Sequence, residues 1–287
     1  MTLISRFDPW RCGFCTCPSK LTFNPYTGCD HGCTYCYASS YIPRFFDCRP
    51  KRDLVRRLRK EADGLNGELL SISNSSDPYP VLEAKMGLTR SCLEILAKSS
   101  CRVQIITKSP LVTRDIDFLK KVPSMVSLTV TTDDDNTAGL IEPHAPPPSA
   151  RLRAIETLID NGVPVSVRVD PVIPLVNDNP ESLMKTLASL GVRHITSSTL
   201  KFRSDGWRRF SAGLPETAEK LRPLYFEKGE LRAGYHCLPA YMRLRLMERL
   251  GALAGQYGME FGACREGLGH LNTAVCDGSW LLDEAVS

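Results

Sequence analysis

Short apolar runs typical of β-strands alternate with stretches of helical period along most of this chain. An alternation of this kind predicts a parallel sheet with helical crossovers, either open and doubly wound or curled into a barrel. Ligands in such folds bind at the carboxyl ends of the strands. The expected strands are residues 21–23, 68–73, 102–107, 126–131, 164–169 and 193–197, and the expected helices are residues 54–65, 88–96, 113–121, 152–159 and 183–190.

Several of these strands end in polar or Pro-rich residues, at 74–79, 107–110, 131–135 and 168–171. Ordinary turn chemistry explains any one of them, but their shared position on one predicted face favours a pocket. Beyond about residue 200 the alternation lapses, and residues 242–253 predict one long amphipathic helix. We therefore expect an irregular Cys-containing segment at 1–19, a core barrel at 20–200 and a C-terminal extension at 201–287.

Composition narrows the class of protein. With 43% hydrophobic and 24% charged residues, the chain excludes a mainly disordered protein. It has no apolar run long enough to span a membrane and no signal-like N-terminus, so we expect a cytoplasmic protein. A net charge of +4 permits a nucleic-acid partner without indicating one. Twelve cysteines are many for such a chain and suggest metal ligands or redox groups.

Three cysteines, Cys29, Cys33 and Cys36, follow the first expected strand in a C-x3-C-x2-C spacing. Thiolates at these intervals on a glycine-containing loop could bind three irons of a [4Fe–4S] cluster and leave the fourth iron open. Zinc is an alternative, with His31 completing the ligand set. A thioredoxin-like pair, Cys33 and Cys36, is another, although it leaves Cys29 unused.

The motif and its surroundings resemble the radical S-adenosylmethionine (SAM) superfamily, and in particular the subgroup related to spore photoproduct lyase. The resemblance covers roughly residues 20–200. It rests on the three cysteines and on the segments Asn24-Pro25-Tyr26, His31-Gly32, Cys36-Tyr37-Ala38, Thr107-Lys108-Ser109-Pro110 and Asp170-Pro171-Val172-Ile173-Pro174.

This resemblance implies a partial (β/α)6 TIM-type barrel with N- and C-terminal extensions. It implies an enzyme of lyase or transferase type that binds a [4Fe–4S] cluster and SAM. An electron from a donor such as ferredoxin or flavodoxin cleaves SAM reductively to a 5′-deoxyadenosyl radical, which abstracts hydrogen from the substrate. Two rival classes stay open: a metal-stabilised nucleic-acid-binding protein and an electron-transfer Fe–S protein without SAM chemistry.

The resemblance also assigns contacts with SAM. Each assigned residue has a structural alternative, since Asp77-Pro78 is a common turn and a single lysine after a strand is usually solvated. The assigned residues are Tyr35 and Ile173 beside the adenine, Ser75, Ser76 and Asp77 around the methionine amino group, Lys108 on the carboxylate, and Thr131 and Arg168 on the ribose or carboxylate.

One departure concerns the reaction. Spore photoproduct lyase uses a hydrogen-donating cysteine near the end of its second strand, and residues 71–77 of this chain contain none. Reversal of thymine dimers is therefore in doubt.

Further cysteines lie outside the motif. Cys48, Cys92 and Cys101 are expected to be small buried apolar residues. The remaining ones could hold a second Fe–S cluster or zinc, or else be reactive surface thiols. They form two groups, Cys12, Cys15 and Cys17 near the start and Cys237, Cys264 and Cys276 near the end.

Basic stretches could contact a nucleic-acid substrate. Residues 44–60 are rich in Lys and Arg, and Arg203, Arg208 and Arg209 flank Trp207 and Phe210, which could stack on bases. Solvated helix faces explain such stretches more often. The substrate therefore stays open at this stage.

Overall fold

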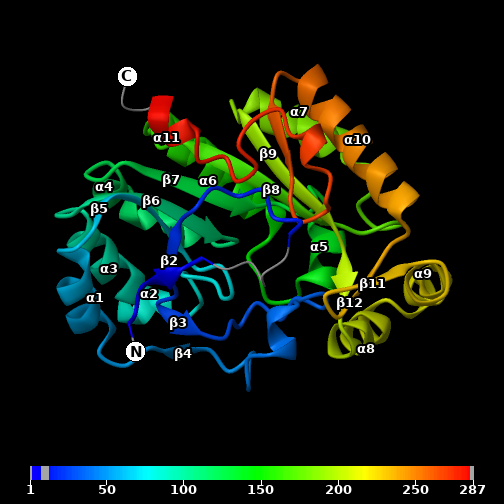
Figure 1. Cartoon of the computed structure of the whole chain (residues 1–287), viewed down its shortest axis with the longest axis horizontal. Coiled ribbons are helices and arrows are strands. Elements are labelled where there is room, and N and C mark those ends of the chain that lie inside the picture. Colours follow the sequence, from blue (N-terminus) through cyan, green and yellow to red (C-terminus); the bar gives the residue numbers. More distant parts are fainter. Residues whose placement is uncertain (1, 8–12, 285–287) are drawn as a thin grey trace.

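The main sheet has eight strands in the order β1-β2-β5-β6-β7-β8-β9-β13 (Figure 1). The computed structural model describes residues 2–7 and 13–284. Neighbouring strands from β2 to β13 pair in parallel, and β1 pairs with β2 antiparallel. The strands are β1 (Ser5–Arg6), β2 (Leu21–Phe23), β5 (Asn66–Ile72), β6 (Ser100–Thr107), β7 (Ser124–Thr129), β8 (Val165–Val172), β9 (His194–Thr199) and β13 (Glu260–Ala263).

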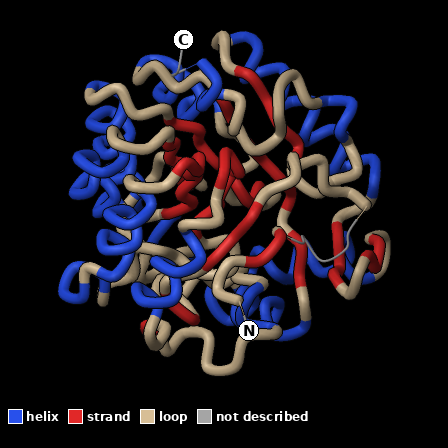
Figure 2. Tube along the Cα trace, turned by 60° about the vertical axis from the view of Figure 1, so that its left-hand side comes forward, coloured by secondary structure: helices blue, strands red, loops and turns tan. Residues whose placement is uncertain are grey.

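This sheet confirms the predicted α/β class and each of the expected strands. The strands run through the middle of the molecule and the helices lie outside them (Figure 2). Helices join successive parallel strands, and all except the short α2 and α5 fall where the periodicity placed them. They are α1 (Leu54–Ala62), α2 (Glu83–Met86), α3 (Leu88–Leu96), η2 (Pro110–Asp115), α4 (Ile116–Leu119), α5 (Asp135–Ile141), α6 (Pro148–Asp160) and α7 (Glu181–Ser189).

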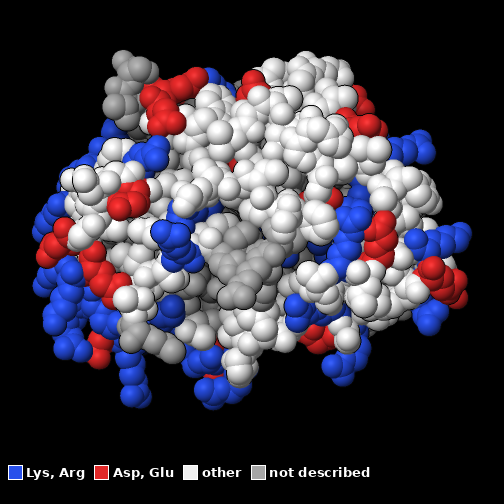
Figure 3. Space-filling view, viewed as in Figure 1, with Lys and Arg blue, Asp and Glu red and all other residues white. Residues whose placement is uncertain are grey.

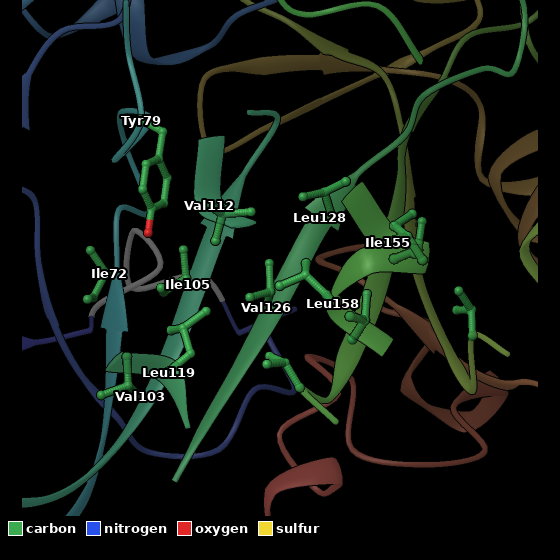
Figure 4. Close-up of a cluster of buried hydrophobic side chains, with 14 of the residues drawn as sticks. Ile72, Tyr79, Val103, Ile105, Val112, Leu119, Val126, Leu128, Ile155 and Leu158 are labelled. Atoms are coloured by element: carbon green, nitrogen blue, oxygen red, sulfur yellow. The ribbon is translucent and has the colours of Figure 1, made fainter. Parts of the chain in front are cut away.

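The principal hydrophobic core lies between the sheet and these helices. Aliphatic side chains of β7 face those of α6, as Val126 and Leu158 show (Figure 4). Both side chains are fully buried. Because the outer face of the sheet is apolar and covered, the polar side chains at the strand ends are left to line a site.

The residues expected as a C-terminal extension divide into two parts. The first is a small layer with its own aromatic core, in which the Phe202 and Tyr225 ring centroids lie 4.8 Å apart. The second returns to the main sheet, where β13 pairs with β9. The elements are β10 (Lys201–Phe202), α8 (Ser204–Gly213), α9 (Pro215–Phe226), β11 (Glu230–Arg232), β12 (Tyr235–Cys237), α10 (Ala240–Gln256), η3 (Gly269–Leu271) and α11 (Leu281–Glu284).

None of the helices in residues 2–7 and 13–284 is both long and apolar enough to span a membrane. Three short elements, β3 (Tyr26–Thr27), η1 (Ala38–Ser40) and β4 (Arg49–Pro50), lie on either side of the cysteine motif.

A buried ion pair joins α6 to the segment that precedes it. Arg151 and Glu142 are almost fully buried, and Arg151 Nη2 lies 2.5 Å from Glu142 Oε2. Arg151 also donates to the carbonyl oxygens of Pro146 and Thr129. Its removal would leave a buried carboxylate without its closest cation.

We predict that Arg151→Met lowers the free energy of unfolding by about 3–5 kcal/mol, because breaking one side of a buried pair exposes the full desolvation cost of the other. Arg153→Met is the matched control, since Arg153 lies on the same helix and is exposed. It should change stability by less than about 0.5 kcal/mol. Anaerobic urea unfolding measures both variants, and equal losses would contradict this account of Arg151.

Candidate active site

A cavity of about 530 Å³ opens at the carboxyl ends of the parallel strands. Residues at or just after the carboxyl ends of β2, β5, β6, β8 and β9 line it, as expected for a parallel α/β fold. Most of the residues assigned to SAM binding lie on its wall. These are Tyr35, Ser75, Ser76, Asp77, Lys108 and Arg168, together with Cys29, Cys33 and Cys36.

Two of the assigned residues lie behind the wall. Thr131 is buried and donates to Glu142 Oε1 at 2.5 Å, so it contacts a residue of the site without lining the cavity. Ile173 is fully buried in the aromatic core of the C-terminal layer. In this structure neither side chain lines the cavity that holds the other assigned residues.

The cysteine loop is held by backbone contacts. Gly28 has a φ of +82°, and the Cys29 amide donates to the Phe45 carbonyl at 2.8 Å. At the other end of the loop, Arg209 donates to the Cys36 carbonyl at 2.9 Å and to Ser39 Oγ at 2.7 Å. The three thiols therefore face the cavity from a loop anchored at both ends.

Burial raises the pKa of all three motif thiols, and it raises that of Cys33 to about 12. The thiols are therefore protonated in the metal-free protein. A metal would replace those protons, because thiolate is the ligating form.

The spacing of the thiols suits a cluster better than a single ion. Among the described residues, the potential ligand atoms within 4.8 Å of one another belong to Cys29, Asp30 and His31. This trio is the closest match to the zinc alternative, but it leaves Cys33 and Cys36 out. In a cube each cysteine binds a different iron, so the three motif thiols are expected to stand further apart.

The Asp77 carboxylate links the ends of β5 and β6. Oδ1 accepts from Thr107 Oγ1 at 2.7 Å and from the Tyr79 amide at 2.8 Å, and Oδ2 accepts from the Lys108 amide at 2.8 Å. His31 Nδ1 lies 3.7 Å from Oδ2. Because both oxygens of this carboxylate already accept hydrogen bonds from the protein, Asp77 holds the neighbouring polar residues in place.

A second buried carboxylate, Glu142, contacts three of the assigned residues. Tyr35 and Thr131 donate to it, and Lys108 Nζ lies 3.6 Å from Oε1. Burial opposes its charged form, yet the Lys108 and Arg151 charges hold the pKa of Glu142 at about 2. Sequence reasoning missed Glu142, whose only signal is its place between a short helix and the Pro-rich residues 146–148.

Arg168 approaches the cavity beside a bulge in β8. Its guanidinium pairs with Asp170 at 2.5 Å, and Ser198 donates to the same carboxylate at 2.6 Å. The register of β8 against β9 shifts between Val169 and Val172, which turns Asp170 towards the cavity.

The other cysteines separate into two groups. Cys15, Cys17, Cys264 and Cys276 lie together, whereas Cys237 lies in β12, where its Sγ contacts the Tyr235 carbonyl. Cys12 lies outside the described residues. Cys92 and Cys101 are buried apolar residues, as expected, and Cys48 is partly exposed.

Comparison with known proteins agrees with this geometry. A family model described as the radical SAM superfamily matches residues 23–190, more than half of the chain. The chain therefore belongs to the radical SAM superfamily, and it is a radical SAM enzyme. This confirms the class predicted from the cysteine motif.

The relatives in sequence carry no described activity. An uncharacterized protein of Mycobacterium tuberculosis is 27% identical over 263 residues, covering 84% of this chain and 75% of the relative. An uncharacterized protein of Acidianus two-tailed virus is 31% identical over 253 residues, covering 75% of this chain and 83% of the relative.

Solved structures share the fold at low sequence identity. Spore photoproduct lyase complexed with a dinucleoside spore photoproduct matches with a TM-score of 0.64 and 17% identity, covering 82% of this chain and 74% of that one. A mutant of the same lyase with bound AdoMet and the same ligand gives 0.65 and 16%, covering 88% and 79%. These matches confirm the predicted radical SAM type of barrel.

The turn at Gly28 gives a sharp test of the loop geometry. A Cβ at Gly28 would lie 2.2 Å from the Phe45 carbonyl oxygen, whereas one at Gly67, with a similar φ of +81°, would meet nothing within 4 Å. Both alanines carry the same left-handed strain of about 1–2 kcal/mol. Only Gly28→Ala must also displace the cysteine loop.

We predict that Gly28→Ala lowers iron affinity by about tenfold or more, while Gly67→Ala retains it. Iron and sulfide bound after anaerobic reconstitution measure the difference. Normal loading of Gly28→Ala would show that the loop geometry described above is not needed for the metal.

Proposed function

We propose that Cys29, Cys33 and Cys36 hold the [4Fe–4S] cluster of this radical SAM enzyme, that SAM binds in the adjoining cavity, and that the substrate is a nucleic acid. The observation that carries the proposal is the convergence of three thiols and a set of polar strand ends on one cavity of about 530 Å³. An electron-transfer protein has no need of such a cavity beside its cluster.

When bound, the cluster and SAM supply one-electron cleavage of a C–S bond and a 5′-deoxyadenosyl radical for hydrogen abstraction. Radical SAM enzymes need an electron donor, and a ferredoxin or flavodoxin is the proposed class here. The chain's own task is to present three thiolates, orient SAM and enclose the reacting atoms.

The residues around the cavity divide this work. Lys108 Nζ lies 5.8 Å from the centre of the Tyr35 ring, so the two side chains offer a cation and an aromatic face side by side. We assign the cation to the SAM carboxylate and the ring to the adenine. Ser75 and Ser76 offer hydroxyls for the amino group, and Asn24 Oδ1 accepts from the Ser75 amide and from Ser76 Oγ. Asp77 fixes the backbone of Lys108.

Charge on the cavity wall supports a polyanionic substrate. The cationic residues on the wall outnumber the acidic ones: Arg6, Lys20, Lys108, Arg168, Lys201 and Arg265 against Asp77, Asp170 and Asp277. Tyr37 and Tyr41 add aromatic faces on which a base can stack. The similar lyase was solved with a dinucleoside ligand, which is consistent with this class.

The basic and aromatic residues that the sequence suggested for nucleic-acid binding differ in how exposed they are to solvent. Phe210 is fully buried, and Trp207 packs edge-on against Phe226 at 4.8 Å, so stacking on bases by this pair is not supported. Arg209 is engaged with the cysteine loop, and Arg203 lies over the Tyr235 ring. Arg208 is exposed on α8, which packs against η1 beside the cysteine loop.

A second basic surface lies on the other side of the molecule. Lys and Arg side chains gather over α1 at the left of the space-filling view (Figure 3). Arg56, Arg59 and Lys60 are exposed there. This surface serves as a control for binding at the rim of the cavity.

We predict that Cys29→Ala, Cys33→Ala and Cys36→Ala each abolish SAM cleavage, because two remaining thiolates hold the cube too weakly. The measurement is 5′-deoxyadenosine formed by the reconstituted, reduced protein with SAM, and Cys101→Ala is the thiol control. If wild type with a verified cluster forms no 5′-deoxyadenosine, an electron-transfer or metal-stabilised binding protein replaces the proposal.

We predict that tRNA or single-stranded DNA binds and that its affinity falls steeply with added salt, because phosphate contacts release counterions. Arg208→Glu should weaken binding about tenfold, and Arg59→Glu on α1 should change it far less. Filter binding across a salt series measures both. No binding at low ionic strength, or salt-independent binding, would contradict the nucleic-acid class and favour a peptide or a small molecule.

A further inference from the structure

Thiols from the two ends of the chain meet at one place. Cys17 Sγ lies 3.8 Å from Cys276 Sγ, although the two residues are 259 positions apart. The neighbouring Cys17 thiol raises the pKa of Cys15, and the neighbouring Cys276 thiol lowers the pKa of Cys264. We refer to Cys15, Cys17, Cys264 and Cys276 as the four-thiol cluster.

The fold holds the two C-terminal members of the cluster rigidly. Cys264 follows β13, and its amide donates to the Ser197 carbonyl at 2.7 Å. Thr196 Oγ1 donates to the Cys276 carbonyl at 2.9 Å. A Cβ on Gly262 would lie 2.5 Å from the same carbonyl oxygen, so the chain at Cys276 is pressed against β13.

The N-terminal members are held by close packing on the same loops. Thr16 Oγ1 accepts from Asn272 at 3.1 Å. A Cβ on Gly267 would lie 2.9 Å from the Phe14 ring, and one on Gly269 would lie 2.9 Å from Thr16. Two glycines thus allow residues 14–16 to lie directly on the C-terminal loop.

The cluster borders the same cavity as the motif cysteines. Cys17 and Cys264 both line that cavity. Arg168 Nη2 lies 3.7 Å from Cys264 Sγ, and the buried Lys20, paired with Asp277 at 2.6 Å, also faces the cavity. Nearby cations suit a group of thiolates, whereas buried cysteines that serve only as packing have apolar neighbours.

We propose that Cys15, Cys17, Cys264 and Cys276 ligate a second iron–sulfur cluster, which joins the two ends of the chain and forms part of the wall of the SAM cavity. Four protein ligands complete its coordination, so this cluster is distinct from the one with an open iron. It goes beyond the function proposed above, which needs only the motif cysteines.

The geometry favours iron–sulfur over a single zinc ion. Zinc bonds of about 2.3 Å bring all four sulfurs to within about 3.8 Å of one another. No three of these four described thiols fall within 4.8 Å of one another, although Cys17 and Cys276 touch. A [2Fe–2S] cluster fits this arrangement, because each of its two irons takes two thiolates, so Cys17 and Cys276 can share one iron while the other two thiols stand further away. The 3.8 Å contact is also far from the roughly 2.05 Å of a disulfide.

The experiment removes the three motif cysteines, so that any iron still bound belongs to the four-thiol cluster. The Cys29→Ala/Cys33→Ala/Cys36→Ala variant is reconstituted anaerobically with iron and sulfide, and circular dichroism verifies its fold. We expect it to retain about a third of the wild-type iron, equimolar sulfide and the visible absorbance of a cluster, because a [2Fe–2S] cluster adds two irons to the four of the motif cube. Adding Cys15→Ser and Cys17→Ser to this variant should remove the remaining iron, sulfide and visible absorbance. Adding Cys237→Ser instead, as the matched control, should leave all of them unchanged.

Converse variants keep this inference separate from the proposed function. The Cys15→Ser/Cys17→Ser variant alone should lose about a third of the iron and keep the part that responds to SAM. If that variant fails to fold, Cys264→Ser tests the other segment. Three results would overturn the second cluster: no iron in the folded motif variant, one zinc without sulfide, or equal iron loss with Cys237→Ser.

Discussion

The buried carboxylate of Glu142 is the contact on which the active-site geometry depends most. It pairs with Arg151 from α6 and with Lys108 from the end of β6, and it accepts a hydrogen bond from the Tyr35 hydroxyl of the cysteine loop. Backbone bonds add to it, since the Thr34 amide donates to Ile141 and the His144 amide donates to His31. One short segment after α5 thus ties the cysteine loop to two strands and a helix.

This arrangement explains why a buried charge is retained in the centre of the fold. A carboxylate removed from water costs several kcal/mol unless cations and donors compensate it. Here the two cations that compensate Glu142 have different roles, because Arg151 is fully buried and Lys108 reaches the cavity. A ligand that draws Lys108 towards itself would still leave Glu142 paired with Arg151, so the loop can stay in place while SAM binds.

Much of the fold could be predicted from the sequence because it follows local periodicity. The six predicted strands and the longer helices between them appear where apolar spacing placed them. In contrast, β13 contains only four residues, one of them glycine, and its pairing with β9 depends on a long return of the chain. Such non-local pairing leaves no periodic signal.

The candidate site was predictable to the extent that its chemistry lies in short motifs. The three motif cysteines were predicted from their spacing, and Ser75 to Asp77 and Lys108 were predicted because they follow strands directly. Thr131 and Ile173 were assigned correctly to strand ends, but tertiary packing buries them behind the wall. Glu142 was missed for the opposite reason, since its role arises only when α6, β6 and the cysteine loop meet.

The most direct test of this account is anomalous diffraction at the iron and zinc edges from crystals of the anaerobically reconstituted protein with SAM. The account predicts iron density bonded to Cys29, Cys33 and Cys36, with SAM beside Lys108 and Tyr35 in the cavity. Density for one zinc ion at Cys29, Asp30 and His31, with Cys33 and Cys36 unligated, would contradict it.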